Sequence, residues 1–322
     1  MPVVTVRLIM CALACAVAAP LAAQTWPARP VRIVVPYTPG GGIDTVARVL
    51  APKLAEQLGG SFVVENRPGA AGVVGAEIVA RAAPDGYTLL ASATEFAINP
   101  AAGRKLPYDP FRDFTHISQL ASVQFILGAH PSVPARNAKE LIAIAKARPG
   151  ELTYGSSGTG GGPHLAGELF QLMAGIKWTH VPFKGAQPAA TAVLSGEIDL
   201  AFGATIGLAA HVNSGRMRAI GVTGEKRYPG LPNVPTIAES GLPGYTAIGW
   251  YGYYGPAGMA PVLVRRIYTE TAKALGAPDT KEKLAKAGNE YVMSPPEEFG
   301  PFLKAETAKW GKVARAANIK FE

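Results

Sequence analysis

The segments of this sequence best suited to chemistry are two glycine-rich loops, each standing between a predicted strand and a predicted helix. Glycine lets a backbone turn sharply and approach a ligand, and the first turn of a helix offers unpaired N–H groups and partial positive charge. Such a loop binds an anion without lysine or arginine. A hydrogen bond to a charged group contributes about 1.5–3 kcal/mol and micromolar binding needs about 8 kcal/mol, so a few donors per loop are sufficient.

The first loop follows a predicted strand at 31–35 and contains three consecutive glycines. Three glycines cost more backbone entropy than a plain turn requires, which favours a binding function. Thr45 stands where a dinucleotide fingerprint needs its third glycine, and the Gly-Lys-Ser/Thr ending of a phosphate-binding loop is absent. For Asp44 we favour a structural role as a helix cap or first-turn acid. The candidate ligand-binding residues here are Tyr37, Thr38, Pro39, Gly40, Gly41, Gly42 and Asp44.

The second loop covers 156–162 and adds hydroxyl groups, which can donate hydrogen bonds to a carboxylate. A serine-hydrolase elbow, Gly-x-Ser-x-Gly, fails because Thr159 occupies the position of the last glycine. His164, just inside the next helix, has two open roles: it lines a cleft, or it packs as a hydrogen-bonded core residue. The candidates from this region are Ser156, Ser157, Gly158, Thr159 and His164.

A third group of candidates follows the predicted strand at 87–91. Ligands gather at the carboxyl ends of parallel strands, so Ser92, Thr94 and Phe96 are candidates for the same site. The aromatic run at 250–254 has near-alternating spacing. We expect half of it to be the core of a crossing strand and the other half to be available to a ligand.

Catalysis and metal binding have little support in the sequence. Both cysteines, Cys11 and Cys15, precede the mature chain, and the five histidines form neither a cluster nor a His-Glu-x-x-His motif. A nucleophile with a paired base is not recognisable either. We therefore expect no catalytic residue, no metal site and no cofactor.

The order of elements predicts an α/β fold with mostly parallel sheets flanked by helices. A strand–helix alternation occurs twice, and each time a glycine-rich loop joins a strand to a helix. The first unit has strands at 31–35, 62–64 and 87–91 with helices at 43–58 and 73–82. The second has strands at 153–155, 178–182, 198–203 and 217–223 with helices at 138–148, after 162 and at 186–195, and 262–318 is mostly helical.

The N-terminus has the pattern of a secretory signal peptide: Arg7, an apolar run over 8–19, and small residues before Gln24. We expect cleavage after Ala23. The run is shorter than the ~20 residues of a membrane-spanning helix, and no later stretch resembles one. Of the 322 residues, 48% are apolar, and the formal charge of +8 comes from scattered rather than clustered basic residues. An exported protein with a packed core and no nucleic-acid partner is expected.

A set of motifs across nearly the whole mature chain resembles the Bug receptors, the substrate-binding proteins of tripartite tricarboxylate transporters. The motifs lie at 26–27, 30–36, 39–44, 64–70, 83–90, 106–110, 130–134, 164–168, 181–185 and 231–236. The resemblance implies a periplasmic type II binding protein whose two lobes close on a small carboxylate. It further implies that backbone amides, hydroxyls and bridging waters of the loops at 37–44 and 156–159 hold the ligand, which then passes to two membrane components.

The lobes expected from this resemblance are 24–124 plus 249–322 and 125–248, with hinge crossings near 122–125 and 246–250. Many relatives have proline at the position of Thr38 and aspartate after the phenylalanine that matches Phe202, where this chain has Gly203 followed by Ala204. An acid at Gly203 would pair with an amino group, so its replacement favours a dicarboxylate or aromatic carboxylate without an amine. We expect a monomer. The rival hypotheses are an exported carboxylic-ester hydrolase and a ligand sensor without a transport role.

Overall fold

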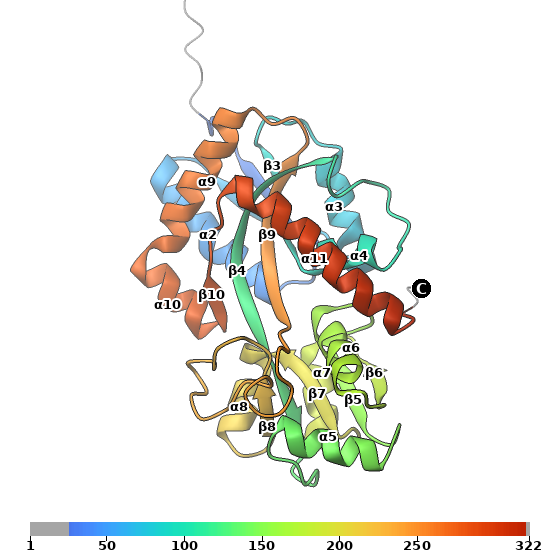
Figure 1. Cartoon of the computed structure of the whole chain (residues 1–322). Coiled ribbons are helices and arrows are strands. Elements are labelled where there is room, and N and C mark those ends of the chain that lie inside the picture. Colours follow the sequence, from blue (N-terminus) through green and yellow to red (C-terminus); the bar gives the residue numbers. More distant parts are fainter. Residues whose placement is uncertain (1–25, 320–322) are drawn as a thin grey trace, which may run out of the picture.

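The computed structural model describes residues 26–319, so the predicted signal peptide at 1–23 lies outside the described residues. Figure 1 shows two groups of strands and helices, one above the other, joined by two long strands. We call them the first and the second α/β unit. The α/β class predicted from the sequence is confirmed, and helices flank the strands of both units.

In the first unit, a parallel set of strands has the order β2-β1-β3. β-branched and apolar residues form the central strand β1, and four of its five side chains are buried. The elements are β1 (Val31–Val35), α2 (Gly42–Leu58), β2 (Phe62–Asn66), η1 (Ala70–Gly72), α3 (Val73–Ala80), β3 (Thr88–Ala93) and α4 (Glu95–Ala101). Both β1 and β3 therefore end next to one another, at the edge where α2 and α4 begin.

Two long strands, β4 (Phe114–Ala129) and β9 (Ile248–Pro256), join the units. β9 is antiparallel to β3 and to the first part of β4, while the second part of β4 pairs with β7 and β8. The pairs Ser122–Trp250 and Gln124–Ile248 lie where the chain passes from one unit to the other. The two crossings are therefore hydrogen-bonded neighbours in one continuous sheet.

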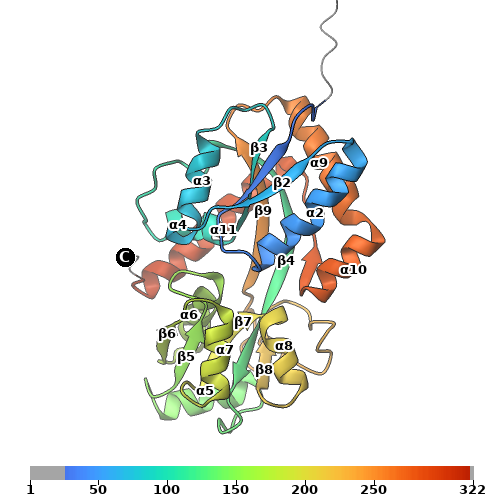
Figure 2. The same cartoon turned by 180° about the vertical axis from the view of Figure 1, so that it is seen from behind.

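The second unit repeats the design, with β5 parallel to both β6 and β7. Its elements are α5 (Ala138–Ala147), β5 (Thr153–Ser156), α6 (Gly162–Ala174), β6 (Thr179–Pro182), α7 (Ala186–Leu194), β7 (Leu200–Ala204), α8 (Thr205–Asn213) and β8 (Arg218–Val222). Asn137 caps α5 by accepting a hydrogen bond from the Glu140 N–H at 2.9 Å. Seen from behind, α7 and α8 cover the face of this unit that turns toward the viewer (Figure 2).

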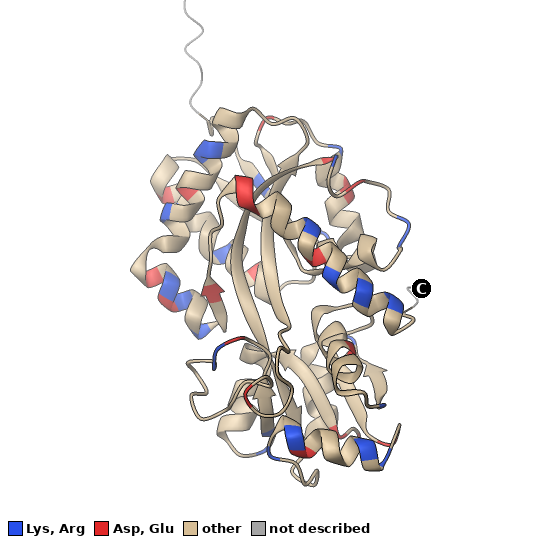
Figure 3. Ribbon diagram, in the orientation of Figure 1, with Lys and Arg blue, Asp and Glu red and all other residues tan. Residues whose placement is uncertain are grey.

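The C-terminal segment returns to the first unit, as α9 (Pro261–Gly276), α10 (Pro278–Lys286), β10 (Asn289–Tyr291) and α11 (Pro296–Ala316). α11 contacts α4 and also reaches α6 of the second unit. Glu306 on α11 accepts hydrogen bonds from the indole N–H groups of Trp250 and Trp310, at 2.9 and 2.8 Å. Charged residues of both signs are spread over the outer helices, with a run of basic residues toward the end of α11 (Figure 3). Between residues 26 and 319 no helix combines the length and the apolar character that a membrane span requires.

Candidate ligand-binding site

Asp44 gives the first glycine loop its shape from within. Its carboxylate, 2% exposed, accepts hydrogen bonds from the Gly40 N–H at 2.9 Å, from Arg48 Nε at 2.9 Å and from Asn66 Nδ2 at 2.8 Å. Burial raises the pKa of Asp44, but the donors Arg48, Gly40 and Asn66 outweigh it and hold that pKa below its ordinary value. The structural role favoured for Asp44 agrees with these contacts.

The groups of this loop that remain available to a partner are consequently mostly backbone rather than side-chain groups. α2 begins at Gly42, and Gly41 precedes it with no side-chain cap. The first N–H groups of a helix have no partner inside the helix, so those of the first turn of α2 are open to an acceptor from outside. Thr38, Pro39, Gly40 and Gly41 are exposed, and Tyr37 and Gly42 are half-buried.

Ser156 and His164 shape the second glycine loop from below. The Ser156 hydroxyl is fully buried, donates to the Gly158 carbonyl at 3.1 Å and accepts from the Gly158 N–H at 3.2 Å. It also lies 2.7 Å from Nε2 of His180. His164 Nδ1 accepts a hydrogen bond from the Gly160 N–H at 2.9 Å. Of the two roles left open for His164, these contacts support the packed, hydrogen-bonded one.

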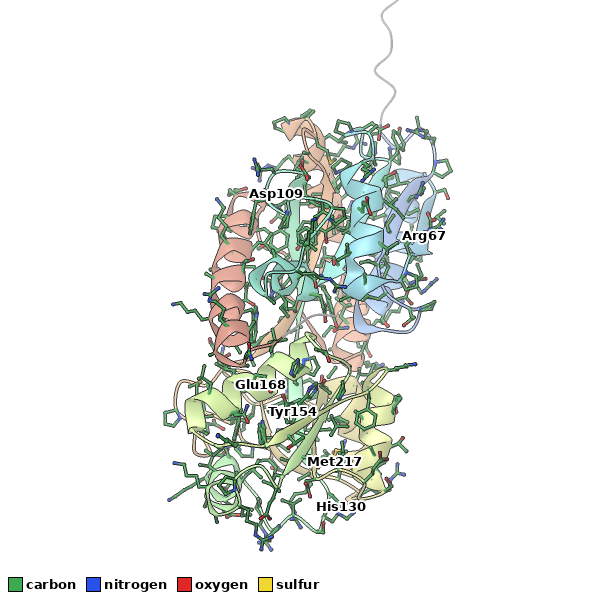
Figure 4. All side chains as sticks on the ribbon, turned by 90° about the vertical axis from the view of Figure 1, so that its right-hand side faces the viewer. Arg67, Asp109, His130, Tyr154, Glu168 and Met217 are labelled. Carbon is green, nitrogen blue, oxygen red and sulfur yellow. The ribbon has the colours of Figure 1, made fainter. Side chains whose placement is uncertain are left out.

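A buried polar network continues beneath this loop. The His164 and His180 rings stack with centroids 3.8 Å apart, and Tyr154 donates to Glu168 Oε1 at 2.5 Å. Figure 4 shows Tyr154 and Glu168 side by side at the top of the second unit. Burial and the adjacent His164 lower the pKa of His180 to about 3. Burial raises the pKa of Glu168, but hydrogen bonds from His164 and Tyr154 lower it overall.

Ser157, Gly158 and Thr159 form the upper surface of the second loop. Ser157 and Gly158 are half-buried and Thr159 is exposed, so this part of the loop is turned away from the network below it. α6 starts at Gly162 without a side-chain cap from Gly161, but its second residue, Pro163, has no N–H, and the Gly162 N–H meets Glu95 of the first unit. The groups that the second loop offers are therefore chiefly the Ser157 and Thr159 hydroxyls.

Glu95, at the start of α4, lies where the two loops come together. Tyr37 of the first loop donates from its hydroxyl to Glu95 Oε2 at 3.2 Å, and lies 3.4 Å from the Ser92 hydroxyl. Oε1 of the same carboxyl lies only 3.6 Å from the point that a Cβ would occupy at Gly161 of the second loop. The Gly162 N–H also forms a backbone hydrogen bond with the Glu95 carboxylate. A side chain of the first unit thereby touches the helix start of the second.

Aromatic rings of the crossing strands lie against the glycines of both loops. A Cβ on Gly42 would collide with the hydroxyl of Tyr251 on β9, and a Cβ on Gly162 would lie 2.9 Å from the Phe125 ring on β4. Tyr251 and Phe125 are 8% and 5% exposed. Both rings belong to strands that join the units, and glycine is required at Gly42 and Gly162 by close packing.

Thr94 and Phe96 are placed away from the loops. Phe96 is 2% exposed and packs in an aromatic cluster, 4.3 Å from Tyr254 and 5.0 Å from Phe114 between ring centroids. The Thr94 hydroxyl accepts from the Trp250 N–H at 2.9 Å and so attaches the end of β3 to β9. Both side chains therefore serve the core of the first unit, although Ser92 of the same segment does contact Tyr37.

Gly203 and Ala204 end strand β7 of the second unit. Gly203 is buried, and a Cβ there would lie 2.9 Å from Leu208 Cδ1. Ala204 is half-buried and pairs with Phe125. The ring that packs on Gly162 thus has Ala204 as its strand neighbour, which brings the end of β7 near the start of α6.

Sequence reasoning passed over Glu95, although it considered the residues on either side. The signal was present, because an acid directly after a predicted strand stands at the edge where ligands collect. A separate cavity of about 980 Å³ lies elsewhere, between α10, β10 and the segment at 225–230. None of the predicted site residues lines that cavity.

Two α/β units on continuous crossing strands, with a helix start from each turned toward the other, define a two-lobed binding protein. The family model described as "Tripartite tricarboxylate transporter family receptor" matches residues 46–319. The chain is 34% identical to protein BugT of Bordetella pertussis over 308 residues, covering 95% of this chain and 94% of BugT. It belongs to this family of receptors.

Solved structures agree with this assignment. A structure titled "R. palustris Rpa4515 with adipate" is 37% identical, with a TM-score of 0.83 over 91% of this chain and 99% of that one. MatC (Rpa3494) from Rhodopseudomonas palustris, with bound malate, is 29% identical, with a TM-score of 0.79 over 90% of this chain and 100% of that one. The Bug resemblance is thereby confirmed, and the chain is a solute-binding protein rather than an enzyme.

Proposed function

We propose that this protein is a periplasmic receptor that captures a small organic carboxylate between its two units and delivers it to the membrane subunits of a tripartite tricarboxylate transporter. The observation that carries the proposal is the approach of two helix starts, at Gly42 and Gly162, to the Tyr37–Glu95 contact: the start at Gly42 has no side-chain cap, and the start at Gly162 meets the Glu95 carboxylate. Main-chain donors at helix starts bind carboxylates without a basic side chain. Export through a signal peptide cleaved after Ala23 is part of the same proposal.

The proposed ligand class is a dicarboxylate or an aromatic carboxylate. Adipate and malate, the ligands in the titles of two related structures, are both dicarboxylates. Gly203 offers no acid to an amino group, and Leu208 packs at the point that its Cβ would occupy. The side chains of Tyr251 and Phe125 lie against Gly42 and Gly162, the first residues of α2 and α6.

The proposed contacts follow from the loop geometry. In the first loop they are the N–H groups around Gly41 and Gly42, together with the Tyr37 hydroxyl. In the second they are the hydroxyls of Ser157 and Thr159, because the N–H and the carbonyl of Gly158 are already bonded to Ser156. Asp44, Ser156 and His164 would act on the ligand indirectly, because hydrogen bonds within their own loops already engage them.

We take the lobes to be 24–124 plus 249–322 and 125–248, with hinges at 122–125 and 246–250. Closure around a ligand would bend the paired crossings of β4 and β9 together. Their pairing at Ser122–Trp250 and Gln124–Ile248 supports this choice, because a bend of one strand there must be shared by the other.

The test is a thermal-shift screen followed by calorimetry, with adipate, malate, benzoate and glutamate as probes. A ligand that binds only the folded state at one hundred times its Kd stabilises it by about 2.7 kcal/mol. We expect stabilisation by at least one amine-free acid. Stabilisation by amino acids alone would contradict the proposed ligand class. Transport is tested by deleting the gene and measuring uptake of the acid found.

A further inference from the structure

Glu95 places a carboxylate of the protein itself at a helix start where the carboxylate of a ligand could bind. It leaves the first unit at the start of α4, and its two carboxylate oxygens face different units: Oε2 faces the Tyr37 hydroxyl at 3.2 Å, and Oε1 faces Gly161. The Gly162 N–H, which the α6 helix leaves without an internal partner, bonds to the same carboxyl. The donors expected to receive a ligand acid at this loop are therefore already in contact with an acid of the protein.

The surroundings of Glu95 contain donors and phenols. From the first loop Tyr37 faces it, from β9 Tyr251 does, and from the second loop the backbone at Gly161 and Gly162 does. Burial raises the pKa of Glu95, and the groups that counteract the rise are its own backbone N–H, the Tyr37 hydroxyl and the Gly162 N–H, none of which is a cation. The charge on Glu95 in turn raises the pKa values of Tyr37 and Tyr251, after burial itself.

We infer that Glu95 competes within the molecule for the carboxylate position at the start of α6, and so sets both the charge preference and the pH dependence of acid binding. An anionic guest at this position must displace the Glu95 carboxylate or accept its like charge at close range. Two like charges a few ångströms apart in a partly buried site repel each other strongly, because the local dielectric constant is well below that of water. Protonated Glu95 removes that repulsion and, by its O–H, becomes a donor to the guest.

This inference rests on the proposed function and predicts how the affinity for an acid changes with pH. Because Glu95 ionises as the pH rises through its raised pKa, the affinity for an acid that is already fully ionised falls with rising pH. A dicarboxylate is affected more strongly than a monocarboxylate if its second carboxylate also lies near α6. An amine on the ligand would have the opposite preference, since Glu95 would attract it.

Calorimetry measures the binding of adipate and of benzoate to the wild type and to Glu95→Gln. The measurements are made at pH 5.5, 6.5, 7.5 and 8.5, in steps of ~1 unit, which is the usual spread of carboxyl pKa values in folded proteins. Glutamine keeps the size of the side chain and does not ionise. We expect Glu95→Gln to bind the acids about tenfold more tightly at the highest pH, the change equivalent to one pKa unit. The pH dependence of the wild type should be absent in the variant. Glu95→Ala serves as a second variant, and Glu151→Gln, an exposed acid on the second unit, as the matched control.

A ligand-free measurement keeps the inference separate from the proposed function. The pKa of Glu95 is raised in the folded state, so its contribution to stability is complete below the ordinary value of 4.5 and is lost as the pH rises through the folded value. The Tm of the wild type minus that of Glu95→Gln should therefore decrease as the pH rises, without any acid present. Failure of every acid to bind either protein, with this Tm difference intact, would overturn only the proposed function.

Two results would overturn the inference itself. One is equal affinity of the wild type and Glu95→Gln for adipate and benzoate at every pH. The other is weaker binding by Glu95→Gln, which would make Glu95 a direct partner of a donor on the ligand. Tight binding of glutamate by the wild type, lost in Glu95→Gln but not in Glu151→Gln, would identify that donor as an amine.

Discussion

The two glycine loops share one backbone design but are supported in different ways. Under the first loop, a single ionised acid, Asp44, collects donors from Gly40, from Asn66 and from Arg48, whose side chain is 51% exposed. Under the second, a buried network of neutral and paired groups joins Ser156 and His180 to the loop. Similar glycine-rich loops can therefore be supported by one charged group near the surface or by several hydrogen bonds in the core. Substitutions under the two loops should therefore affect the stability of the protein in different ways.

Removal of Glu168 should produce the largest effect, because it breaks the network under the second loop. Glu168→Leu leaves the Tyr154 hydroxyl with only the His164 carbonyl at 3.3 Å, and removes the acceptor of Gln171 and the acid next to His164. Each buried donor left without an acceptor costs about 1–3 kcal/mol. Urea unfolding should show a loss of this size, against less than about 0.5 kcal/mol for the exposed control Glu151→Gln. A loss as small as the control's would mean that the network does not support the fold.

The glycine at the start of α2 should be the most sensitive position of the first loop. A Cβ on Gly42 meets the Tyr251 hydroxyl, and overpacking of this kind costs about 1–3 kcal/mol. Gly42→Ala should therefore lower the free energy of unfolding, and Tyr251→Phe in the same chain should restore only part of it, because Cζ of the ring would still lie 2.8 Å from the new Cβ. Gly41→Ala is the matched control, since the nearest atom to its Cβ is the Thr38 oxygen at 3.8 Å. Additive effects of the two substitutions would argue against the contact.

Asp44→Asn tests the single-charge construction of the first loop. The amide can accept from Gly40 or Asn66 but loses the ionic hydrogen bond to Arg48, a loss of about 1–2 kcal/mol because the arginine is largely solvated. Acid binding should also weaken, because the loop loses a fixed shape. Asp85→Asn, which removes the exposed pair with Arg29, should change neither quantity. A change in Asp85→Asn as large as that in Asp44→Asn would contradict a special role for Asp44.

The two constructions should also differ in their sensitivity to acid. His180 is kept neutral in the folded state by a pKa of about 3, below its ordinary value of 6.5, so the unfolded chain binds the extra proton first. Its contribution to stability is complete above pH 6.5 and is lost as the pH falls toward about 3. The Tm of the wild type should fall more steeply than that of His180→Gln between these values. Parallel curves would show that His180 titrates normally.

Local pattern was enough to predict both loops and most of the strands and helices. Glycine runs between an apolar strand and an amphipathic helix are read from neighbouring residues, and the helices α2, α6 and α7 begin within a residue or so of the predicted positions. β4 escaped prediction because register shifts at His116/Ser118 and Gln119/Ala121 interrupt the two-residue alternation by which a strand is recognised. Without that strand, the route of the chain between the units could be inferred only by resemblance.

The different roles of adjacent residues were harder to predict than the order of the strands and helices. The segment at 92–96 was predicted to follow the strand, but Ser92 is still part of β3, and a helix begins at Glu95 and turns successive side chains in different directions. Glu95 faces the loops, while Phe96 is directed into the aromatic core. Which of two adjacent residues reaches a ligand depends on where the helix starts, a boundary that pattern reading places only to within a few residues.

Composition and short-range pattern thus determined the α/β class, the twin loops and the absence of any recognisable catalytic motif, because each depends on residues close together in the chain. Three features depended on contacts between residues far apart in sequence. They are the pairing of β3, β9 and β4, the position of Glu95 next to Gly161, and the division of each loop into groups that support it and groups that remain available to a ligand. Such contacts follow from how strands and helices pack in three dimensions, and burial then decides which polar groups pair with each other and which remain for a guest.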